Sequence, residues 1–303
     1  MKRMFSVVLA ALCVAALCSG CGNVSYAESD QIIISADELA NYIGKENTVI
    51  VDMQTEEDYL KSHIPGAVNI QLKDITVSLP VDNMLAPKGK IAKVLGGAGI
   101  DNNTTVVIYD EGKSLNSARL WWSMLVYGHD NIKVVSGGLP AIQAEGLEMT
   151  DQLPQITPKE FVVNDRRDQY LVEMKDVLAL LDNPDPNVIL VDTRSDEEYM
   201  EQGKIPGAVM YNYTRNFYKD GTYLDTQATR INYLESGIRP ENEIILYCRT
   251  SMRAATTFLR LYDAGYRNLK LYDGAFLEWS ASGQNPVEMP DGAPVATGNR
   301  NNS

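Results

Sequence analysis

The chain has 303 residues, which is enough for two domains of ordinary size. Its hydrophobic fraction of 45% and charged fraction of 22% are those of a water-soluble globular protein. The formal net charge of −13 argues against nucleic acid as a partner, because phosphate binding needs clustered lysine and arginine. An anionic substrate must likewise be held by local positive charge, since the overall field repels it.

The N-terminus has the pattern of an export signal. Two basic residues precede the apolar run 7–17, which is too short for an ordinary membrane-spanning helix. Segment 17–21, with the sequence LCSGC, resembles a bacterial lipobox in which a cysteine stands where leucine is expected. We therefore expect residues 1–21 to be a signal peptide of lipoprotein type, with Cys21 lipidated and holding the exported protein at the cell envelope. Ordinary signal cleavage near Ala27 is the alternative.

The chain contains four cysteines, and Cys248 is the one thiol of its globular part. Two of the others lie inside the predicted signal and are removed with it, and Cys21 is either lipidated or removed. This arrangement excludes a small domain held together by disulfides. Cys248 is then left without an internal disulfide partner, and an unpaired thiol in an exported protein requires an explanation.

The sequence after the signal consists of two related halves. The same motifs follow in the same order in each half, with a spacing that differs by only a few residues, so chance similarity is a poor account of them. In this correspondence Asp110 occupies the place of Cys248. The matching segments are 49–52 and 189–192, 64–68 and 205–209, 106–110 and 244–248, and 134–138 and 269–275.

Each half alternates short buried strands with helices, which is the pattern of a parallel sheet covered on both faces. A helical pattern opens the first half over residues 36–43, with Ser35 as its N-cap and Glu38 completing a capping box. Another helical pattern opens the second half over residues 174–181.

We expect two domains, a linker and a tail after the signal. The linker contains two prolines, and the tail is polar, rich in glycine and asparagine, and expected to be mobile. The predicted segments are a first domain over 32–150, the linker over 151–159, a second domain over 160–289 and the tail over 290–303.

Cys248 lies where an apolar run typical of a buried strand ends and a helical pattern begins. A thiol in this place meets the amide groups of a short loop and the positive end of a helix, with Arg249 and Arg253 beside it. Each of these features favours the thiolate over the thiol. The sequence therefore predicts that Cys248 is a nucleophile.

These motifs resemble the tandem rhodanese-type sulfurtransferases over residues 32–288. The resemblance implies an α/β protein of two rhodanese-like domains, each a parallel five-stranded sheet with helices on both faces. The N-terminal domain would lack the nucleophile and the C-terminal domain would carry it. The residues that carry the resemblance are Asp52, 64–67, 117–122, 128–129, 137–138, the loop at Cys248, Trp279 and Gly283.

The resemblance implies that a sulfane sulfur passes from thiosulfate or 3-mercaptopyruvate to Cys248 and then, from the persulfide, to cyanide or a thiol. It implies no cofactor. The partners would be a small anionic donor and this acceptor, bound by a monomer. Arg194 matches an arginine that lines the active site in family members. With Cys248 as the catalytic residue, the substrate-binding residues would be Arg194, Arg249, Thr250, Ser251, Met252 and Arg253.

The donor is indicated by the residue after the cysteine. Relatives that use thiosulfate tend to carry charged residues there, whereas those that use mercaptopyruvate tend to carry small ones, so Arg249 favours thiosulfate. Guanidinium groups also suit the oxygens of this dianion. Arg253 either binds the donor or ties down carbonyl groups of the loop, and both roles stay open.

Other functions fit the sequence less well. A cysteine phosphatase would need five residues between cysteine and arginine, whereas four separate Cys248 from Arg253. A non-catalytic module that binds or senses sulfur would be expected to lack the nucleophile, and a buried inert thiol is the remaining alternative. Because His63 and His129 lie far from Cys248 in sequence, we interpret both as structural. No His/Cys cluster has metal-ligand spacing, so no metal site is predicted.

Overall fold

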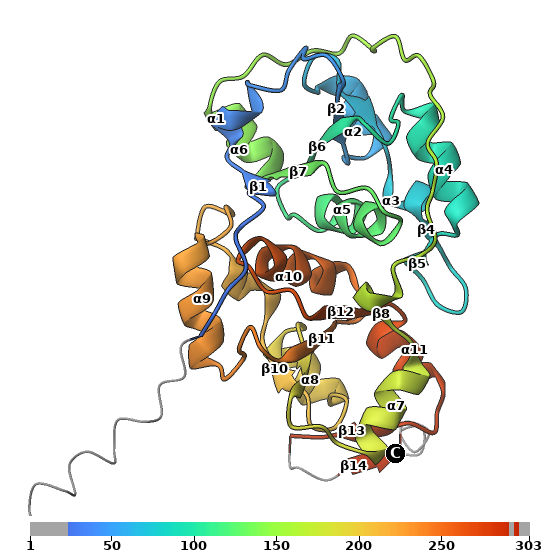
Figure 1. Cartoon of the computed structure of the whole chain (residues 1–303), viewed down its shortest axis with the longest axis vertical. Helices are drawn as coiled ribbons and strands as arrows, with labels where there is room; N and C mark the ends of the chain where they lie inside the picture. The colour runs from blue at the N-terminus through green and yellow to red at the C-terminus, as the bar shows by residue number, and fades with distance from the viewer. Residues whose placement is uncertain (1–23, 291–293, 297–303) are drawn as a thin grey trace, which may run out of the picture.

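The computed structural model describes residues 24–290 and 294–296, in which two α/β domains lie one above the other (Figure 1). The predicted signal peptide and Cys21 lie outside these residues. Each domain is built on a five-stranded sheet whose strands are all parallel. The predicted fold class is therefore confirmed. Over the described part of the chain, no helix is long and apolar enough to cross a membrane.

The first sheet has the strand order β1-β7-β6-β2-β3. The carboxylate of Glu38 accepts a hydrogen bond from the N–H of Ser35 at 2.8 Å, as the predicted capping box requires. Its strands are β1 (Ile33–Ile34), β2 (Thr48–Asp52), β3 (Val68–Asn69), β6 (Thr105–Tyr109) and β7 (Ile132–Val135); a hairpin of β4 (Thr76–Val77) and β5 (Met84–Leu85) is added, and the helices are α1 (Ala36–Leu39), α2 (Glu56–Lys61), α3 (Leu72–Ile75), α4 (Lys88–Gly97), α5 (Asn116–Val126) and α6 (Gly138–Ala144).

The second sheet repeats this topology, with the order β10-β9-β11-β12-β8. A two-stranded antiparallel sheet, β13 with β14, follows it. The strands are β8 (Leu171–Val172), β9 (Val188–Asp192), β10 (Val209–Met210), β11 (Glu243–Tyr247), β12 (Leu269–Tyr272), β13 (Pro286–Glu288) and β14 (Pro294–Ala296); the helices are α7 (Met174–Asp182), α8 (Asp196–Gln202), α9 (Thr226–Glu235), α10 (Met252–Asp263) and α11 (Ala275–Ala281), with 3-10 turns η1 (Asp168–Tyr170) and η2 (Tyr213–Asn216).

Both faces of the central strands are buried, as the unbroken apolar runs of the sequence predict. Ile244 and Leu246 of β11 pack into a central core cluster, whereas Ile245 and Tyr247 pack into an outer one. Neighbouring residues of a strand point to opposite faces, so helices must cover both sides of the sheet. The central cluster also contains residues of the first domain, including Val106, so the two domains share one continuous apolar core.

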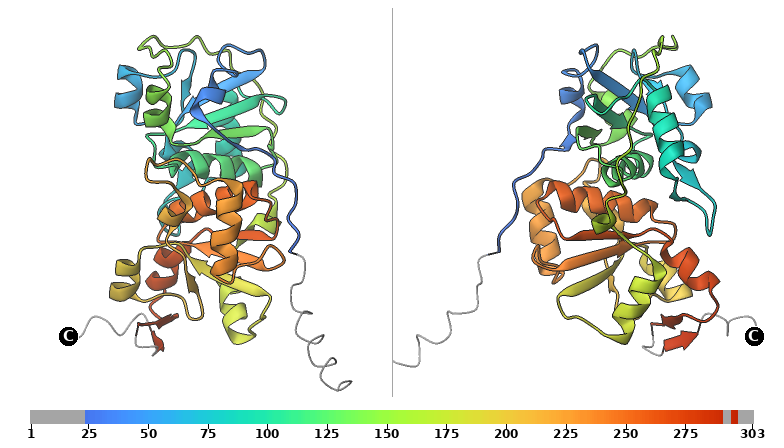
Figure 2. Two further views of the ribbon diagram at one scale, coloured as in Figure 1. Left: turned by 90° about the vertical axis from the view of Figure 1, so that its left-hand side faces the viewer. Right: turned by 45° about the vertical axis from the view of Figure 1, so that its right-hand side comes forward.

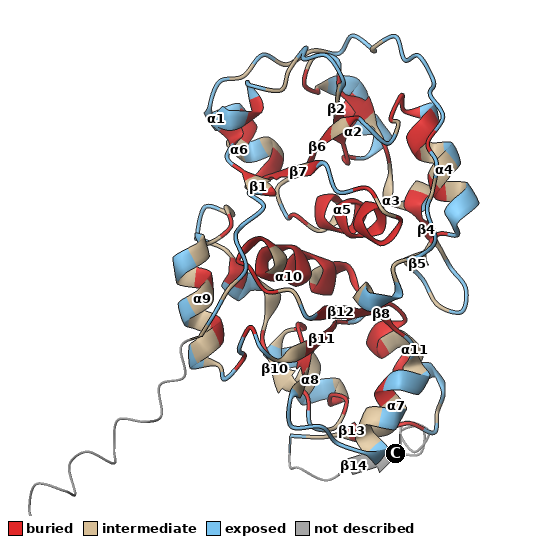
Figure 3. Ribbon diagram, viewed as in Figure 1, coloured by how far each residue is buried: buried red, intermediate tan, exposed pale blue. Residues whose placement is uncertain are grey.

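The domains meet through α5 and α10, which lie against each other and are almost wholly buried (Figure 3). The ring of Trp121 on α5 contacts Phe258 on α10, with ring centroids 5.9 Å apart. A buried ion pair crosses the same junction, with Arg119 Nη2 2.6 Å from Asp273 Oδ1. The second oxygen of Asp273 accepts a hydrogen bond from the N–H of Leu85 at 2.7 Å. Apolar packing and a buried charge pair therefore hold the two domains together.

The N-terminal segment also connects the domains. Figure 2 shows it running along the second domain before it enters the first sheet. The N–H of Ala27 donates to the carbonyl of Gly265 at 3.1 Å, and the ring of Tyr26 packs against Tyr266. Further along, the N–H of Ile32 donates to the carboxylate of Asp263 at 2.7 Å. The chain before β1 thus fastens the first domain to the second.

The chain between the two sheets stays on the first domain for longer than predicted. Phe161 packs against His129, with ring centroids 5.7 Å apart. The N–H of Arg167 donates to the carbonyl of Val126 at 2.9 Å. Residues 160–167, assigned to the second domain by the prediction, therefore pack on the first domain, because the ring of Phe161 is buried there.

Part of the predicted mobile tail, 290–303, forms a strand. Within the described residues of this segment, β14 pairs antiparallel with β13, and Val295 lies opposite Val287. The structure differs from the prediction at 294–296, because pairing with β13 orders the backbone of this short stretch.

Replacing Asp273 should weaken the domain junction. In Asp273→Asn the amide keeps the shape of the carboxylate, but the charge of Arg119 is left uncompensated in a buried site, so we expect a loss of about 3–5 kcal/mol in the free energy of unfolding. Urea titration followed by circular dichroism measures this loss. Glu243→Gln is the control, since it removes a partly exposed pair with Lys270 and should cost less than about 1 kcal/mol. Equal losses in the two variants would contradict this account of the junction.

Candidate active site

Cys248 directly follows β11, and α10 begins four residues later at Met252. The loop that joins β11 to α10 is held by two N–H groups at the start of α11. The N–H of Phe276 donates to the carbonyl of Cys248 at 2.9 Å, and the N–H of Leu277 donates to the carbonyl of Arg249 at 3.0 Å. The cysteine is 1% exposed and has no disulfide partner among the described residues. The predicted setting of the thiol, between a buried strand and a helix, is confirmed.

Ser251 makes the sharp turn from this loop into α10. It adopts a left-handed backbone conformation with φ of 61°, and its hydroxyl donates to the carbonyl of Tyr272 at 2.6 Å. Because the helix starts at once, the N–H groups of its first turn have no acceptor within the helix and form its positive end. Of the other predicted loop residues, Thr250 is half-buried and Met252 is buried as the first residue of α10.

Arg253 lies in the first turn of α10 and forms a two-pronged ion pair with Glu198 of α8. The two N···O distances are 2.5 and 2.8 Å. Burial acts to lower the pKa of Arg253, but Glu198 and the nearby sulfur of Cys248 outweigh it and hold that pKa above its ordinary value. Within the described residues, the hydrogen bonds of the Arg253 guanidinium go to the carboxylate of Glu198 and not to loop carbonyls.

Arg194 has a structural environment. It is wholly buried, and its guanidinium forms an ion pair with Asp192 at 2.6 Å. It also donates to the carbonyl of Gly203 at 2.7 Å and lies 3.8 Å from the ring centre of Phe276. These contacts differ from the expectation that it binds the donor, because the buried Asp192 carboxylate needs a cation beside it. Arg194 instead fixes the end of β9 and, through Phe276, the segment that supports the cysteine loop.

Arg249 is the exposed cation of the loop. Its backbone carbonyl is bound by α11, whereas its guanidinium makes no hydrogen bond or ion pair with any residue in the described part of the chain. Its role in binding the donor stays a prediction.

In the corresponding loop of the first domain, the backbone surrounds a carboxylate side chain. The carboxylate of Asp110, which occupies the place of Cys248, accepts hydrogen bonds from the N–H groups of Gly112 at 2.9 Å and Ser114 at 3.1 Å. It also accepts from the N–H and the hydroxyl of Ser117, at 3.2 and 3.0 Å. This loop touches the second domain, since the hydroxyl of Thr256 donates to the carbonyl of Ser114 at 2.7 Å. The first domain thus contributes packing and no nucleophile.

Sequence reasoning missed Glu198. It belongs to the repeated motif before Tyr199, and its counterpart in the first half is Asp58, but nothing in that pattern indicates a partner 55 residues away.

The histidines lie apart from this site. His63 contacts the carbonyls of Tyr59 and Gln152, and His129 packs on Phe161.

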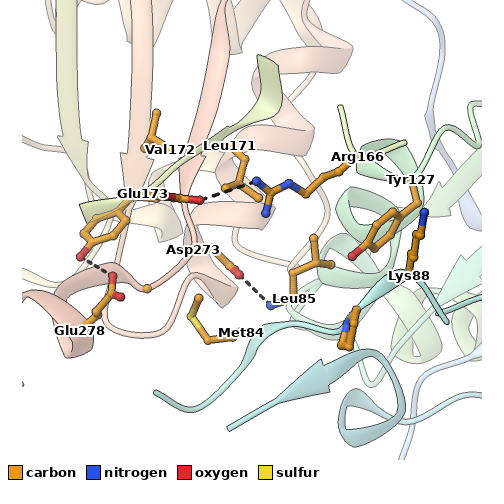
Figure 4. A pocket seen from close by; sticks show the side chains of 13 residues that line it. Met84, Leu85, Lys88, Tyr127, Arg166, Leu171, Val172, Glu173, Asp273 and Glu278 are labelled. Atoms are coloured by element: carbon orange, nitrogen blue, oxygen red, sulfur yellow. Dashed lines mark hydrogen bonds and ion pairs between the residues drawn. The ribbon is translucent and has the colours of Figure 1, made fainter. Parts of the chain in front are cut away.

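A pocket of about 430 Å³ opens at another part of the domain junction (Figure 4). Leu85 and Tyr127 line it from the first domain, and Asp273 and Glu278 line it from the second. Cys248 is not among its lining residues, so this pocket is separate from the thiol.

Two segments of the chain, residues 35–145 and 173–282, match the family model described as rhodanese-like domain. The chain belongs to this family. The two matches correspond to the two halves of the repeat and to the two parallel sheets. They confirm the resemblance that the sequence motifs carry.

Curated relatives of similar length are named for sulfur transfer. A "Putative thiosulfate sulfurtransferase" of Haloferax volcanii is 28% identical and covers 91% of this chain and 99% of its own. The "Sulfur carrier protein TtuD" of Thermus thermophilus is 28% identical over 88% of this chain and 97% of its own. The "3-mercaptopyruvate sulfurtransferase" of Escherichia coli is 26% identical over 84% and 97%. This rhodanese-like chain is a member of the sulfurtransferase family.

Solved structures share the fold. The wild-type structure of EanB matches with a TM-score of 0.76 and 22% identity, over 86% of this chain and 70% of that one. The 3-mercaptopyruvate sulfotransferase SseA of Escherichia coli matches with a TM-score of 0.71 and 24% identity, over 81% and 98%. Both support the arrangement of two rhodanese-like domains.

The two arginines of the prediction should differ in their effect on stability. Arg194→Ala leaves Asp192 buried without its cation, so we expect a loss of about 3–5 kcal/mol in the free energy of unfolding. Arg249→Ala removes an exposed side chain and should change it by less than about 0.5 kcal/mol. Urea unfolding of both variants provides the measurement. A large loss in Arg249→Ala would assign this residue a structural role.

Proposed function

We propose that this protein is a sulfurtransferase that carries sulfane sulfur as a persulfide on Cys248, with thiosulfate as donor and cyanide or a thiol as acceptor. The observation that carries the proposal is the position of Cys248, held between the end of β11 and the N-terminus of α10, with Arg253 in the first turn of that helix. A thiolate is the reactive form of cysteine, and the positive end of α10 favours it.

The reaction takes place in two displacement steps. The Cys248 thiolate attacks the outer sulfur of thiosulfate, a sulfur–sulfur bond forms on the enzyme, and the old one breaks so that sulfite leaves with its electron pair. The acceptor then attacks the terminal sulfur of the persulfide. With cyanide the products are thiocyanate and the regenerated thiolate, and no oxidant, reductant or cofactor is needed.

The persulfide anion requires hydrogen-bond donors around it. The equivalent loop of the first domain is a guide to such donors. There the carboxylate of Asp110, in the place of Cys248, accepts hydrogen bonds from N–H groups of its own loop. The loop after Cys248 is shorter and leads directly into the first turn of α10, whose N–H groups are directed toward its N-terminus. A negatively charged sulfur fits this position for the same reason as the carboxylate.

Arg249 supports thiosulfate as the donor, since it is the exposed cation next to the nucleophile. A second candidate donor is 3-mercaptopyruvate. It is supported by the similarity of this chain to the 3-mercaptopyruvate sulfurtransferase of Escherichia coli, which covers most of its length. Side-by-side assays with the two donors distinguish these candidates.

We propose a monomer as the active form, because the first domain of the same chain already packs against the cysteine-bearing domain.

Mixing the protein with thiosulfate should increase its intact mass by one sulfur atom, located on Cys248. Cyanide should restore the original mass and release an equal amount of thiocyanate. Cys248→Ser should neither gain mass nor form thiocyanate, because a hydroxyl cannot carry the persulfide. Mass spectrometry and a colorimetric thiocyanate assay measure the two steps. Full thiocyanate production by Cys248→Ser would refute the mechanism.

We also propose that the protein is exported and anchored through a lipid on Cys21. The contacts of Tyr26 and Ala27 with the second domain support cleavage before Cys21 over cleavage near Ala27, since the latter would remove a ring that packs on Tyr266 and Arg230.

Lipidation can be tested by labelling cells with a fatty-acid analogue. The wild-type chain should be labelled and found with membranes, whereas Cys21→Ser should be unlabelled, because the thiol that accepts the lipid is missing. Electrophoresis of membrane and soluble fractions shows both results. Cys248→Ser is the control and should be labelled normally. Unlabelled wild-type protein would refute the lipid anchor.

A further inference from the structure

The ion pair between Arg253 and Glu198 determines the charge that surrounds Cys248. Both side chains are about one-fifth exposed, and two N–H···O contacts of 2.5 and 2.8 Å join them. Burial acts to raise the pKa of Glu198, but Arg253 outweighs it and holds that pKa below its ordinary value. The carboxylate is therefore ionised at neutral pH, and the arginine beside the thiol is already neutralised.

A second arginine close to Glu198 is also paired with an acid. Arg194, which acts on Glu198 electrostatically, is compensated by Asp192 at 2.6 Å. Arg249 then remains as the uncompensated cation of the described loop, and the thiolate of Cys248 offsets it. A dianion is held best by two cations, and Arg253, the other arginine next to the cysteine loop, is already paired with Glu198.

We propose that Glu198 limits the affinity of the site for dianionic donors such as thiosulfate, because its ion pair occupies the guanidinium of Arg253. This inference rests on the proposed sulfurtransferase function and refines it, since thiosulfate remains a donor with a binding affinity that Glu198 limits. Glu198 is a positioning residue, because it acts through Arg253 and not on the reacting sulfur.

Glu198 also has a structural role that the test must hold constant. It is the third residue of α8, and its carboxylate accepts a hydrogen bond from the N–H of Ser195 at 3.1 Å in a capping box. Glutamine supports the same motif, so Glu198→Gln removes the charge and keeps this contact. Glu198→Asp keeps the charge, and Glu197→Gln removes an exposed charge from the preceding residue, which has no contact with Arg253.

We expect Glu198→Gln to lower the KM for thiosulfate about tenfold, with a smaller change in kcat, because the freed guanidinium binds the dianion. The effect should shrink as salt is added. Glu198→Asp and Glu197→Gln should stay within about twofold of the wild type. Steady-state kinetics with thiosulfate and cyanide provides the measurement. If Glu198→Gln leaves KM unchanged, or if Glu198→Asp changes it equally, the inference is overturned.

A second measurement is independent of sulfur transfer. The rates at which anionic iodoacetate and neutral iodoacetamide alkylate Cys248 are compared as a ratio, which cancels any change in thiolate content. Glu198→Gln should raise this ratio about fivefold, and Glu197→Gln should not. A wild-type protein that never forms a persulfide would refute the proposed function while this ratio still tests the role of Glu198. An unchanged ratio would overturn the inference even if sulfur transfer occurs.

Discussion

The buried ion pair between Arg119 and Asp273 is the contact on which both the domain arrangement and the candidate site depend. Asp273 follows β12 directly, so it joins the first domain to the second sheet at the point where α11 is about to begin. Three and four residues further on, the N–H groups of Phe276 and Leu277 in α11 donate to the carbonyls of Cys248 and Arg249. Because one short segment makes both sets of contacts, the geometry of the cysteine loop is tied to the junction between the domains.

The two halves use one architecture with different chemistry. At the end of the equivalent strands stand Asp110 and Cys248, and the loop around Asp110 shows that N–H groups gather about a negative charge there. The carboxylate of Asp110 has its hydrogen-bond partners within its own loop. A thiolate in the same place is a nucleophile. The duplicated fold therefore separates a supporting domain from a reactive one.

Local charge at the cysteine differs from what a count of arginines suggests. Two of the three arginines predicted to bind the donor, Arg194 and Arg253, are paired with carboxylates, and the exposed Arg249 remains. In a chain with a net charge of −13, this balance decides how strongly an anion is attracted. For the attraction of an anion to the cysteine loop, the number of arginines matters less than the acidic residues that pair with them.

The sequence by itself determined the repeated α/β plan, the strands that lead to Asp110 and Cys248, and the family. These features depend on hydrophobic periodicity and short motifs, which are local along the chain. Only the tertiary structure decided the partners of the charged side chains. Arg253 meets a carboxylate 55 residues away and Arg119 one 154 residues away, distances over which no sequence pattern specifies contact. Residues 160–167 follow the first domain for the same reason: burial of distant side chains is settled by packing in three dimensions.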